Sequence, residues 1–496
     1  MLRRLLPSTL FLVFVTVSLP ASSLFQPAKT YLSGGAGLSA IAVADVNDDG
    51  RLDLVISNYC ADYSPCAEGN LAVLLGNGDG TFRAAQTYLS GGSGAGGMAL
   101  ADLNRDGVLD IVVTNACASG GRCDGSSNTG SVAVLLGNGD GTFKPAQTFT
   151  IGAQSPGFLA VGDFNGDGKI DVATVNLCNF CTGDQVSVLL GNGNGTLQSP
   201  QTYDLGGQPL GIAVGDVNGD GKLDLLVGGE GVFLGRGDGT FDPQPVSGAG
   251  WFATLADING DGKLDLLQPT ACSNPPSCTK SGVGVALGNG DGTFQTLQNY
   301  SSGGSESDFV AVGDVNRDGK LDVFVANYAS PRFGILLGLG DGTLSPVQLS
   351  NPGVGSQVSI AVGDLNGDGK PDLIVGIGDL NNEVTTSGVG VLLNNTFWTT
   401  TTTIRSHPNP SIQGQAVTFK ARVVSVGSIP PTGTVAFKNG DTQIGTATLS
   451  RGVATLTNKN LPVGSLSITA SYKGDTQSGK SSSSTLIQVV NPGAKP

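Results

Sequence analysis

The chain has 496 residues, of which 78 are Gly and only 13% are charged, and its formal net charge is −14. So much Gly and so little charge favour turns and sheets over helices with charged faces. The acidity excludes nucleic acid as a partner, because nucleic-acid binding needs a basic surface.

The first 23 residues have the features of a secretory signal peptide. Arg3 and Arg4 precede an apolar run at residues 10–19, and small residues at 21–23 provide a cleavage site. A retained membrane anchor is the alternative, but the run is too short to cross a bilayer. No later segment is apolar enough to span a membrane, and no Cys follows the run to accept a lipid. We therefore expect an exported mature chain without a membrane span, outside the cell, at its surface or in the periplasm.

One motif, Asp-x-Asn-x-Asp-Gly-x-x-Asp, occurs seven times, beginning at Asp45, Asp102, Asp163, Asp216, Asp257, Asp314 and Asp364. The mean spacing, (364 − 45)/6 or about 53 residues, is too long for helical hairpin repeats and near that of four-stranded propeller blades. Apolar flanks at residues 41–44 and 52–57 predict strands, so each motif is the loop of a β-hairpin. An EF-hand would need helical flanks and a Glu at position twelve, where the first copy has Ile56.

Each of these cation loops offers oxygen atoms at alternate positions: the side chains at positions one, three, five and nine, and the carbonyl at position seven. Calcium accepts six to eight oxygens in flexible geometry, whereas magnesium requires a near-ideal octahedron and keeps more water. We therefore expect calcium, up to seven ions; the alternative, a metal-free Asp/Asn/Gly turn, is weaker because no copy lacks a ligand. The predicted ligands are Asp45, Asn47, Asp49, Arg51, Asp53; Asp102, Asn104, Asp106, Val108, Asp110; Asp163, Asn165, Asp167, Lys169, Asp171; Asp216, Asn218, Asp220, Lys222, Asp224; Asp257, Asn259, Asp261, Lys263, Asp265; Asp314, Asn316, Asp318, Lys320, Asp322; and Asp364, Asn366, Asp368, Lys370, Asp372.

The same four strands surround every cation loop. In the first repeat, strands at 40–44 and 52–57 flank the loop, a third lies at 71–75, and an Asn-Gly-Asp-Gly turn leads to a fourth at 82–89. The seventh repeat lacks a good fourth strand, because its turn decays at residues 393–396. Residues 25–31 match residues 143–149, the fourth strand of the second repeat. We expect this N-terminal strand to complete the seventh blade and close the ring; a stray strand outside the first blade is the alternative.

The eight cysteines form four local pairs, and each first Cys follows the last Asp of its loop by seven residues. In an exported protein this register predicts four short disulfides in equivalent loops. A redox or zinc motif is the alternative for the third pair, but its register with the others argues against that. The predicted pairs are Cys60 with Cys66, Cys117 with Cys123, Cys178 with Cys181, and Cys272 with Cys278.

Through these loops, residues 25–395 resemble the FG-GAP/VCBS-type repeats, bacterial relatives of the integrin α-subunit propeller. The resemblance implies calcium between the first and second strands of each blade, every motif Asp and Asn as a ligand, and partners on the opposite face. All seven blades carry the loop, where integrins fill only some, and the literal Phe-Gly…Gly-Ala-Pro signature is absent. Integrin-type recognition is therefore not implied. The Arg236-Gly237-Asp238 tripeptide stands where other repeats have Asn-Gly-Asp, and we interpret it as part of a hairpin.

After Phe397 the composition changes to a threonine run, two prolines and a strand-and-turn pattern without Asp-rich loops. Residues 399–490 resemble a bacterial Ig-like domain, chiefly at 414–419 and 471–475, and contain no Cys for an intersheet disulfide. We expect a signal peptide at 1–23, a propeller at 24–395, a linker and the start of the sandwich at 396–410, and an Ig-like domain at 411–490. The expected fold class is all-β: a seven-bladed β-propeller followed by an Ig-like β-sandwich.

His407, placed in the expected linker, is the only histidine, which excludes a Ser-His-Asp or Cys-His arrangement on the propeller. Carboxylates that hold calcium stay ionised and are poorly suited to glycosidase or lyase work. We therefore expect a non-enzymatic binding or adhesion module for an extracellular glycan or a cell-envelope protein. The alternatives are a scaffold without a ligand and, less favoured, an extracellular hydrolase or lyase.

The predicted ligand face lies on the loops opposite the cation loops, because these vary most in length and composition. For Trp251, which precedes a first strand, an ordinary core position is the alternative. The aromatic residues predicted on this face are Tyr59, Tyr63, Phe180, Trp251 and Tyr328.

Overall fold

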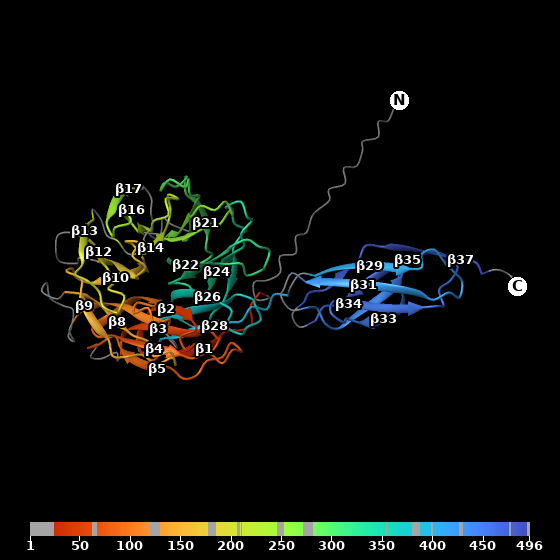
Figure 1. The fold of residues 1–496 in the computed structure, drawn as a ribbon, viewed down its shortest axis with the longest axis horizontal. Helices are drawn as coiled ribbons and strands as arrows, with labels where there is room; N and C mark the ends of the chain where they lie inside the picture. Colours follow the sequence, from red (N-terminus) through yellow and green to blue (C-terminus); the bar gives the residue numbers. More distant parts are fainter. Residues whose placement is uncertain are drawn as a thin grey trace, which may run out of the picture.

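The computed structural model describes residues 24–61, 67–118, 129–176, 185–205, 209, 211–245, 252–270, 281–353, 355–378, 387–397, 400–425, 430–475 and 478–493. Every regular element in these ranges is a strand, and the strands form a ring of sheets and a separate sandwich (Figure 1). The all-β class is confirmed. The same ranges contain no helix with the length and apolar character needed to cross a membrane.

The ring consists, over the described residues, of seven four-stranded antiparallel sheets, which we call blades one to seven. Within blades one to six the spatial order of the strands follows the chain. The strands are β2 (Ala36–Ala44), β3 (Asp53–Cys60), β4 (Asn70–Leu74) and β5 (Gln86–Leu89) in blade one; β6 (Ser93–Ala101), β7 (Asp110–Cys117), β8 (Ser131–Leu135) and β9 (Gln147–Thr150) in two; β10 (Pro156–Gly162), β11 (Asp171–Asn176), β12 (Gln185–Leu189) and β13 (Gln201–Asp204) in three; β14 (Ile212–Gly215), β15 (Asp224–Val227), β16 (Gly231–Gly235) and β17 (Phe241–Pro245) in four; β18 (Thr254–Ala256), β19 (Asp265–Thr270), β20 (Gly282–Ala286) and β21 (Gln298–Ser301) in five; β22 (Ser307–Gly313), β23 (Asp322–Asn327), β24 (Phe333–Leu336) and β25 (Gln348–Ser350) in six; and β26 (Gln357–Gly363), β27 (Asp372–Ile377), β28 (Gly388–Leu392) and β1 (Lys29–Leu32) in seven.

The hydrophobic core of the ring is divided into clusters that lie between neighbouring blades. One cluster joins Leu54 and Leu74 of blade one to Ile374 and Val391 of blade seven, and others join the remaining neighbours. The first strands contact one another around the ring, with β2 beside β26. Because each blade packs on both faces, its middle strands are buried almost throughout, as in β3 and β4. This explains their nearly continuous apolar sequences.

The N-terminal strand completes blade seven. β1 pairs antiparallel with β28, Lys29 lying opposite Val391 and Leu32 opposite Gly388. Ahead of it Phe25 bridges Asn394, just as Phe82 bridges Gly76 in blade one. The observed pairing is the predicted one, and the alternative of a stray strand outside blade one is wrong.

The side chains of this strand also repeat the contacts of other outer strands. Tyr31 meets Phe82 of blade one edge-on at 5.5 Å between ring centroids, as Tyr88 meets Phe143 of blade two at 5.7 Å. Phe25 is buried against Phe333 of blade six. The closing strand is therefore held by neighbours on both sides of blade seven.

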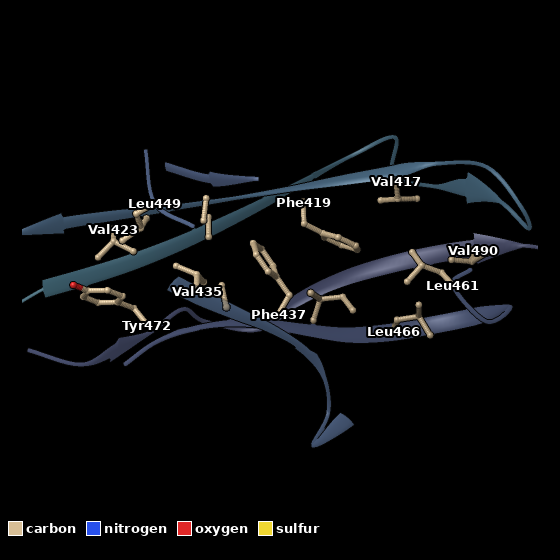
Figure 2. Close-up of a cluster of buried hydrophobic side chains, with 14 residues drawn as sticks. Val417, Phe419, Val423, Val435, Phe437, Leu449, Leu461, Leu466, Tyr472 and Val490 are labelled. Carbon is tan, nitrogen blue, oxygen red and sulfur yellow. The ribbon is translucent and has the colours of Figure 1, made fainter. Parts of the chain in front are cut away.

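The sandwich has one sheet of β29 (Thr400–His407), β31 (Val417–Ser425) and β34 (Val453–Asn458). The other contains β30 (Ser411–Ile412), β37 (Leu486–Asn491), β35 (Gly464–Tyr472), β32 (Thr434–Asn439) and β33 (Thr442–Thr448), with β36 (Ser481–Ser482) beside β35. Figure 2 shows the buried side chains between the sheets, where the rings of Phe419 and Phe437 lie 6.3 Å apart.

The sandwich begins earlier than its predicted core at 411–490. β29 pairs with β31 along its whole length, so residues 400–410 belong to the sandwich. The prediction that Pro408, Pro410 and His407 lie in a linker is wrong, because β29 ends at His407 and β30 follows the second proline. Prolines are common in linkers, but here the two prolines lie where the chain passes from one sheet of the sandwich to the other.

Candidate metal-binding loops and the opposite rim

Each cation loop winds around the carboxylate of its first Asp. In loop one, Asp45 accepts backbone N–H groups from Asn47 at 3.3 Å, Asp49 at 3.1 Å and Gly50 at 2.7 Å. The Asn47 side-chain carbonyl also accepts the Asp49 N–H, and the Asp49 carboxylate accepts that of Arg51 at 3.0 Å. The side-chain oxygens of positions one, three and five, which are predicted ligands, are therefore held in place by hydrogen bonds from the backbone of the same loop.

The same bonds recur around the ring. The N–H groups of positions five and six donate to the carboxylate of position one in the other six loops, and the N–H of position seven donates to the carboxylate of position five. The acceptors are Asp102, Asp163, Asp216, Asp257, Asp314 and Asp364 at position one, and Asp106, Asp167, Asp220, Asp261, Asp318 and Asp368 at position five.

Two positions of each loop adopt the left-handed backbone conformation. Position six is always Gly, as the motif predicts, with φ 79° at Gly50. Position four is left-handed too, with φ 54° at Asp48, 63° at Arg105 and 62° at Arg317, and Gly in the other four loops. This requirement at position four was not predicted, although the Gly found there in four loops was its signal.

The ninth Asp of each loop holds two turns together. Asp53 is fully buried and accepts the N–H of Val46, in the cation loop, at 3.1 Å and that of Gly76, in the Asn-Gly-Asp-Gly hairpin, at 2.7 Å. The arrangement recurs at Asp110, Asp171, Asp224, Asp265, Asp322 and Asp372. The two kinds of turn therefore share one rim of the ring, and the ninth Asp has a structural role that sequence analysis did not assign.

Burial dominates the electrostatics of these carboxylates. Desolvation raises the pKa of every ninth Asp despite its two N–H donors, to about 6 at Asp322 and about 7 at Asp372. At Asp53 the negative charges of Asp49 and Asp45 raise the pKa further. A bound divalent cation would relieve this concentration of negative charge.

The structural role of the ninth Asp predicts a loss of stability that does not depend on metal. Asp171→Ala leaves the N–H groups of Phe164 and Gly191 without their acceptor, so in chelator the unfolding free energy should fall by about 3 kcal/mol. Asp167→Ala in the same loop, an exposed position, should cost less than about 1 kcal/mol under the same conditions. Equal losses for the two variants in denaturant titrations would contradict the assignment.

The donor set of the loops fits calcium. Carboxylate and amide oxygens are the ligands of hard cations, and an ionised carboxylate has about four acceptor positions, of which Asp45 uses three for backbone N–H groups. Across the described ranges, no three His, Cys, Asp or Glu side chains converge into a ready-made metal site. The loops would therefore complete a calcium shell with Asn and main-chain oxygens, and the position-seven carbonyls remain predicted ligands.

The opposite rim carries two of the predicted aromatic residues. Tyr59, the next-to-last residue of β3, and Tyr328, just after β23, are 46% and 43% exposed. Cys60 and Cys117 are both disulfide-bonded, and the pairing predicted for them stays a prediction. Several predicted residues lie outside the described ranges: Cys66, Cys123, Cys178, Cys181, Cys272, Cys278, Tyr63, Phe180 and Trp251.

Three phenylalanines meet near the centre of the ring. Phe158, Phe252 and Phe309 lie 5.0 to 5.7 Å apart between ring centroids, although they come from blades three, five and six. Each stands five residues before the first Asp of its loop, where the other blades have Ala40, Gly97, Gly211 and Ser359. The residue predicted on the ligand face is Trp251, directly before Phe252, and the cluster itself was not predicted. The Phe that three repeats share at this position was the only signal in the sequence, and it does not show that the three rings meet.

Comparison with known proteins identifies both parts of the chain. Residues 59–113, 122–174, 175–227, 277–325 and 314–375 match the FG-GAP-like repeat, and residues 402–491 match the bacterial Ig-like domain of group 3. A search of the curated proteins finds no match.

Among solved structures the chain is similar to several proteins of low sequence identity. The exotype rhamnogalacturonan lyase YesX is 13% identical, with 75% of this chain and 76% of that chain covered and a TM-score of 0.43. The Dos1 propeller is 8% identical, with 74% and 95% covered and a TM-score of 0.40. The V. cholerae biofilm matrix protein Bap1 is 15% identical, with 94% and 85% covered and a TM-score of 0.36. Since the repeat matches extend over more than half of its length, the chain belongs to the FG-GAP-like repeat family and ends in a bacterial Ig-like domain.

Proposed function

We propose that this chain is an exported, calcium-stabilised β-propeller without enzymatic activity, and that it binds an extracellular glycan or a cell-envelope protein. The observation that carries the proposal is the pair of exposed tyrosines, Tyr59 and Tyr328, on the rim opposite the cation loops. Exposed aromatic rings are suited to stacking on sugar rings and to anchoring protein partners.

The two tyrosines occupy one structural position. Each is the sixth residue after the ninth Asp of its loop, in blades one and six respectively. Blade seven lies between them and has Gly378 at this position, where a Cβ atom would come within 3.1 Å of the Val358 side chain. A ligand that reaches both rings would therefore lie across blade seven.

The residues before the tyrosines fix the backbone that presents them. Asn58 is fully buried and its Nδ2 donates to the Ser33 carbonyl at 2.9 Å. Asn327 is buried as well, and its Nδ2 donates to the Arg332 carbonyl at 3.0 Å. Aromatic groups on a fixed backbone lose little conformational entropy when a ligand binds.

The Tyr59 ring itself lies against the next blade. A Cβ atom at Gly94 would come within 2.9 Å of the ring, so the glycine leaves room for the tyrosine to rest on the backbone of blade two. One side of the ring is therefore supported while 46% of the residue stays exposed. This arrangement supports a stacking role.

The division of the ring into two rims supports the same proposal. The cation-loop rim repeats one set of hydrogen bonds in every blade, which suits a structural task. Variable loops on a rigid scaffold are where recognition groups usually stand. The only histidine, His407, is exposed at the end of β29 in the sandwich, so the ring itself contains no histidine.

The test is an array of extracellular polysaccharides and cell-envelope proteins, probed with the mature full-length chain in calcium. For a ligand that binds, Tyr59→Ala with Tyr328→Ala should weaken affinity at least about tenfold, since stacked aromatic groups contribute about 1–3 kcal/mol each. The melting temperature in calcium should be unchanged.

Matched controls replace two other exposed apolar residues, Leu32→Ala with Leu89→Ala, which lie on outer strands. These should leave affinity unchanged. The rim assignment fails if the tyrosine variant binds normally while Asp238→Ala, on the cation-loop rim, abolishes binding. If nothing on the array binds, the alternative of a structural scaffold without a ligand is favoured. Turnover of a polysaccharide would overturn the proposal that the chain is not an enzyme.

A further inference from the structure

The seventh cation loop, residues 364–372, differs from the others in its charged neighbours. Lys370 at position seven places its Nζ 3.2 Å from Oδ2 of Asp368, and the lysine side chain is only 5% exposed. The corresponding side chains are more open to solvent: Lys169 beside Asp167 is 31% exposed, Lys222 beside Asp220 is 44% and Arg51 beside Asp49 is 47%. Solvent screens the open pairs much more than the buried one.

Blade seven lacks the hairpin that stands beside this position in the other blades, with the sequence Gly-Asn-Gly in blade three and Gly-Asp-Gly in the rest. In blade four the Lys222 stem lies next to Gly237 of that hairpin. In blade seven Asn394 stands where blade four has Gly235: its N–H donates to Asp372 at 2.7 Å, as the N–H of Gly235 donates to Asp224. The Nδ2 of Asn394 also donates to the carbonyl of Pro371 at 3.0 Å, directly beside Lys370. The segment that leads to the sandwich therefore packs on the seventh loop.

A second cation reaches the loop from blade six. Arg317 is half-buried, and its guanidinium interacts electrostatically with Asp364, Asp368 and Asp372, the three carboxylates of the seventh loop, as well as with Asp314 of its own. A guanidinium stays protonated in proteins, so Arg317 carries a positive charge. Arg105, at the same position of loop two, is exposed.

We propose that Arg317 and Lys370 take the place of calcium in the seventh loop, so that the propeller binds six calcium ions and not seven. The inference rests on the proposed calcium binding of the other loops. The lysine ammonium already lies at an oxygen of Asp368, a predicted ligand, and the guanidinium adds a second positive charge facing the same three carboxylates. A divalent cation would have to enter against both charges, whereas the other loops present at most one exposed pair of this kind.

The test counts calcium ions per mature full-length chain by equilibrium dialysis with elemental analysis. We expect six for the native chain and seven for Arg317→Met with Lys370→Met, which removes both charges and keeps unbranched, flexible side chains. The matched control, Arg105→Met with Lys169→Met, changes the same two positions in loops two and three and should leave six.

A native chain with seven ions would overturn the proposal, and so would a double variant that melts like the native chain and still binds six. A chain that binds no calcium would instead overturn the proposed calcium role of all the loops. A crystal structure of the native chain grown in calcium needs no variant: anomalous density is expected in loops one to six, and density of equal strength in loop seven would contradict the inference.

Discussion

Removal of calcium should lower the melting temperature of the propeller and leave that of the Ig-like sandwich unchanged. At about 1 mM calcium and a Kd of about 0.1 mM, each filled loop adds roughly 1.4 kcal/mol, so six loops add about 8 kcal/mol. This is comparable to the whole stability of an ordinary domain. The sandwich has no Asp-rich loop and depends on its own apolar core.

Differential scanning calorimetry with and without chelator measures both transitions in one molecule. Magnesium at the same concentration should restore the propeller transition less than calcium does, because it demands a stricter octahedral shell. If the propeller transition does not move in chelator and elemental analysis finds no calcium, the loops are metal-free turns.

Loss of the closing strand should be the most damaging change to the fold itself. A chain that begins at Gly34 lacks β1, and with it the buried Phe25 and the bonds from Gln26 N–H to Leu393 and from Asn395 N–H to Leu24. Burial of Phe25 contributes about 2 kcal/mol and the hydrogen bonds about 1 kcal/mol each. The shortened chain should melt earlier and aggregate, because β28 becomes an exposed strand edge.

Two substitutions in the intact chain separate the effect of losing the buried Phe25 side chain from the effect of removing the whole strand. Phe25→Ala should cost about 3 kcal/mol or more, as large-to-small changes in a core do. Lys29→Ala, an exposed residue of the same strand, should change the unfolding free energy by less than about 0.5 kcal/mol. A chain from Gly34 that stays monomeric and melts like the full mature chain would show that closure contributes little.

The repeated architecture could be predicted from the sequence because one motif carries both its period and its turn chemistry. Strands flank each loop as expected, and the match of residues 25–31 to an outer strand predicted the pairing of β1 with β28. The fourth strands are shorter than predicted: in blade one Phe82 forms only an isolated bridge with Gly76, and β5 begins at Gln86. An alternating pattern of apolar and polar residues does not reveal where the hydrogen-bond ladder between two strands is interrupted.

What could not be predicted depends on contacts between repeats. The ninth Asp looks like one more cation ligand in a list of oxygens, and only the fold brings Gly76 to Asp53. The phenylalanine cluster joins three blades that are distant in the chain, so no single repeat displays it. The linker prediction failed at Pro408 because proline marks a change of direction as readily inside a sandwich as between domains.

The closed ring has a mechanical consequence. The chain enters blade seven at Leu24 and leaves it at Asn395, and these two residues are hydrogen-bonded to each other at 2.7 Å. Because β1 and β28 are antiparallel, tension between the two ends would load one hydrogen bond at a time and peel the strands apart. Traction from a ligand on the Tyr59 rim to the sandwich would instead pull β28 lengthwise between β27 and β1, whose bonds share the load. The molecule should therefore resist force far better along this second path.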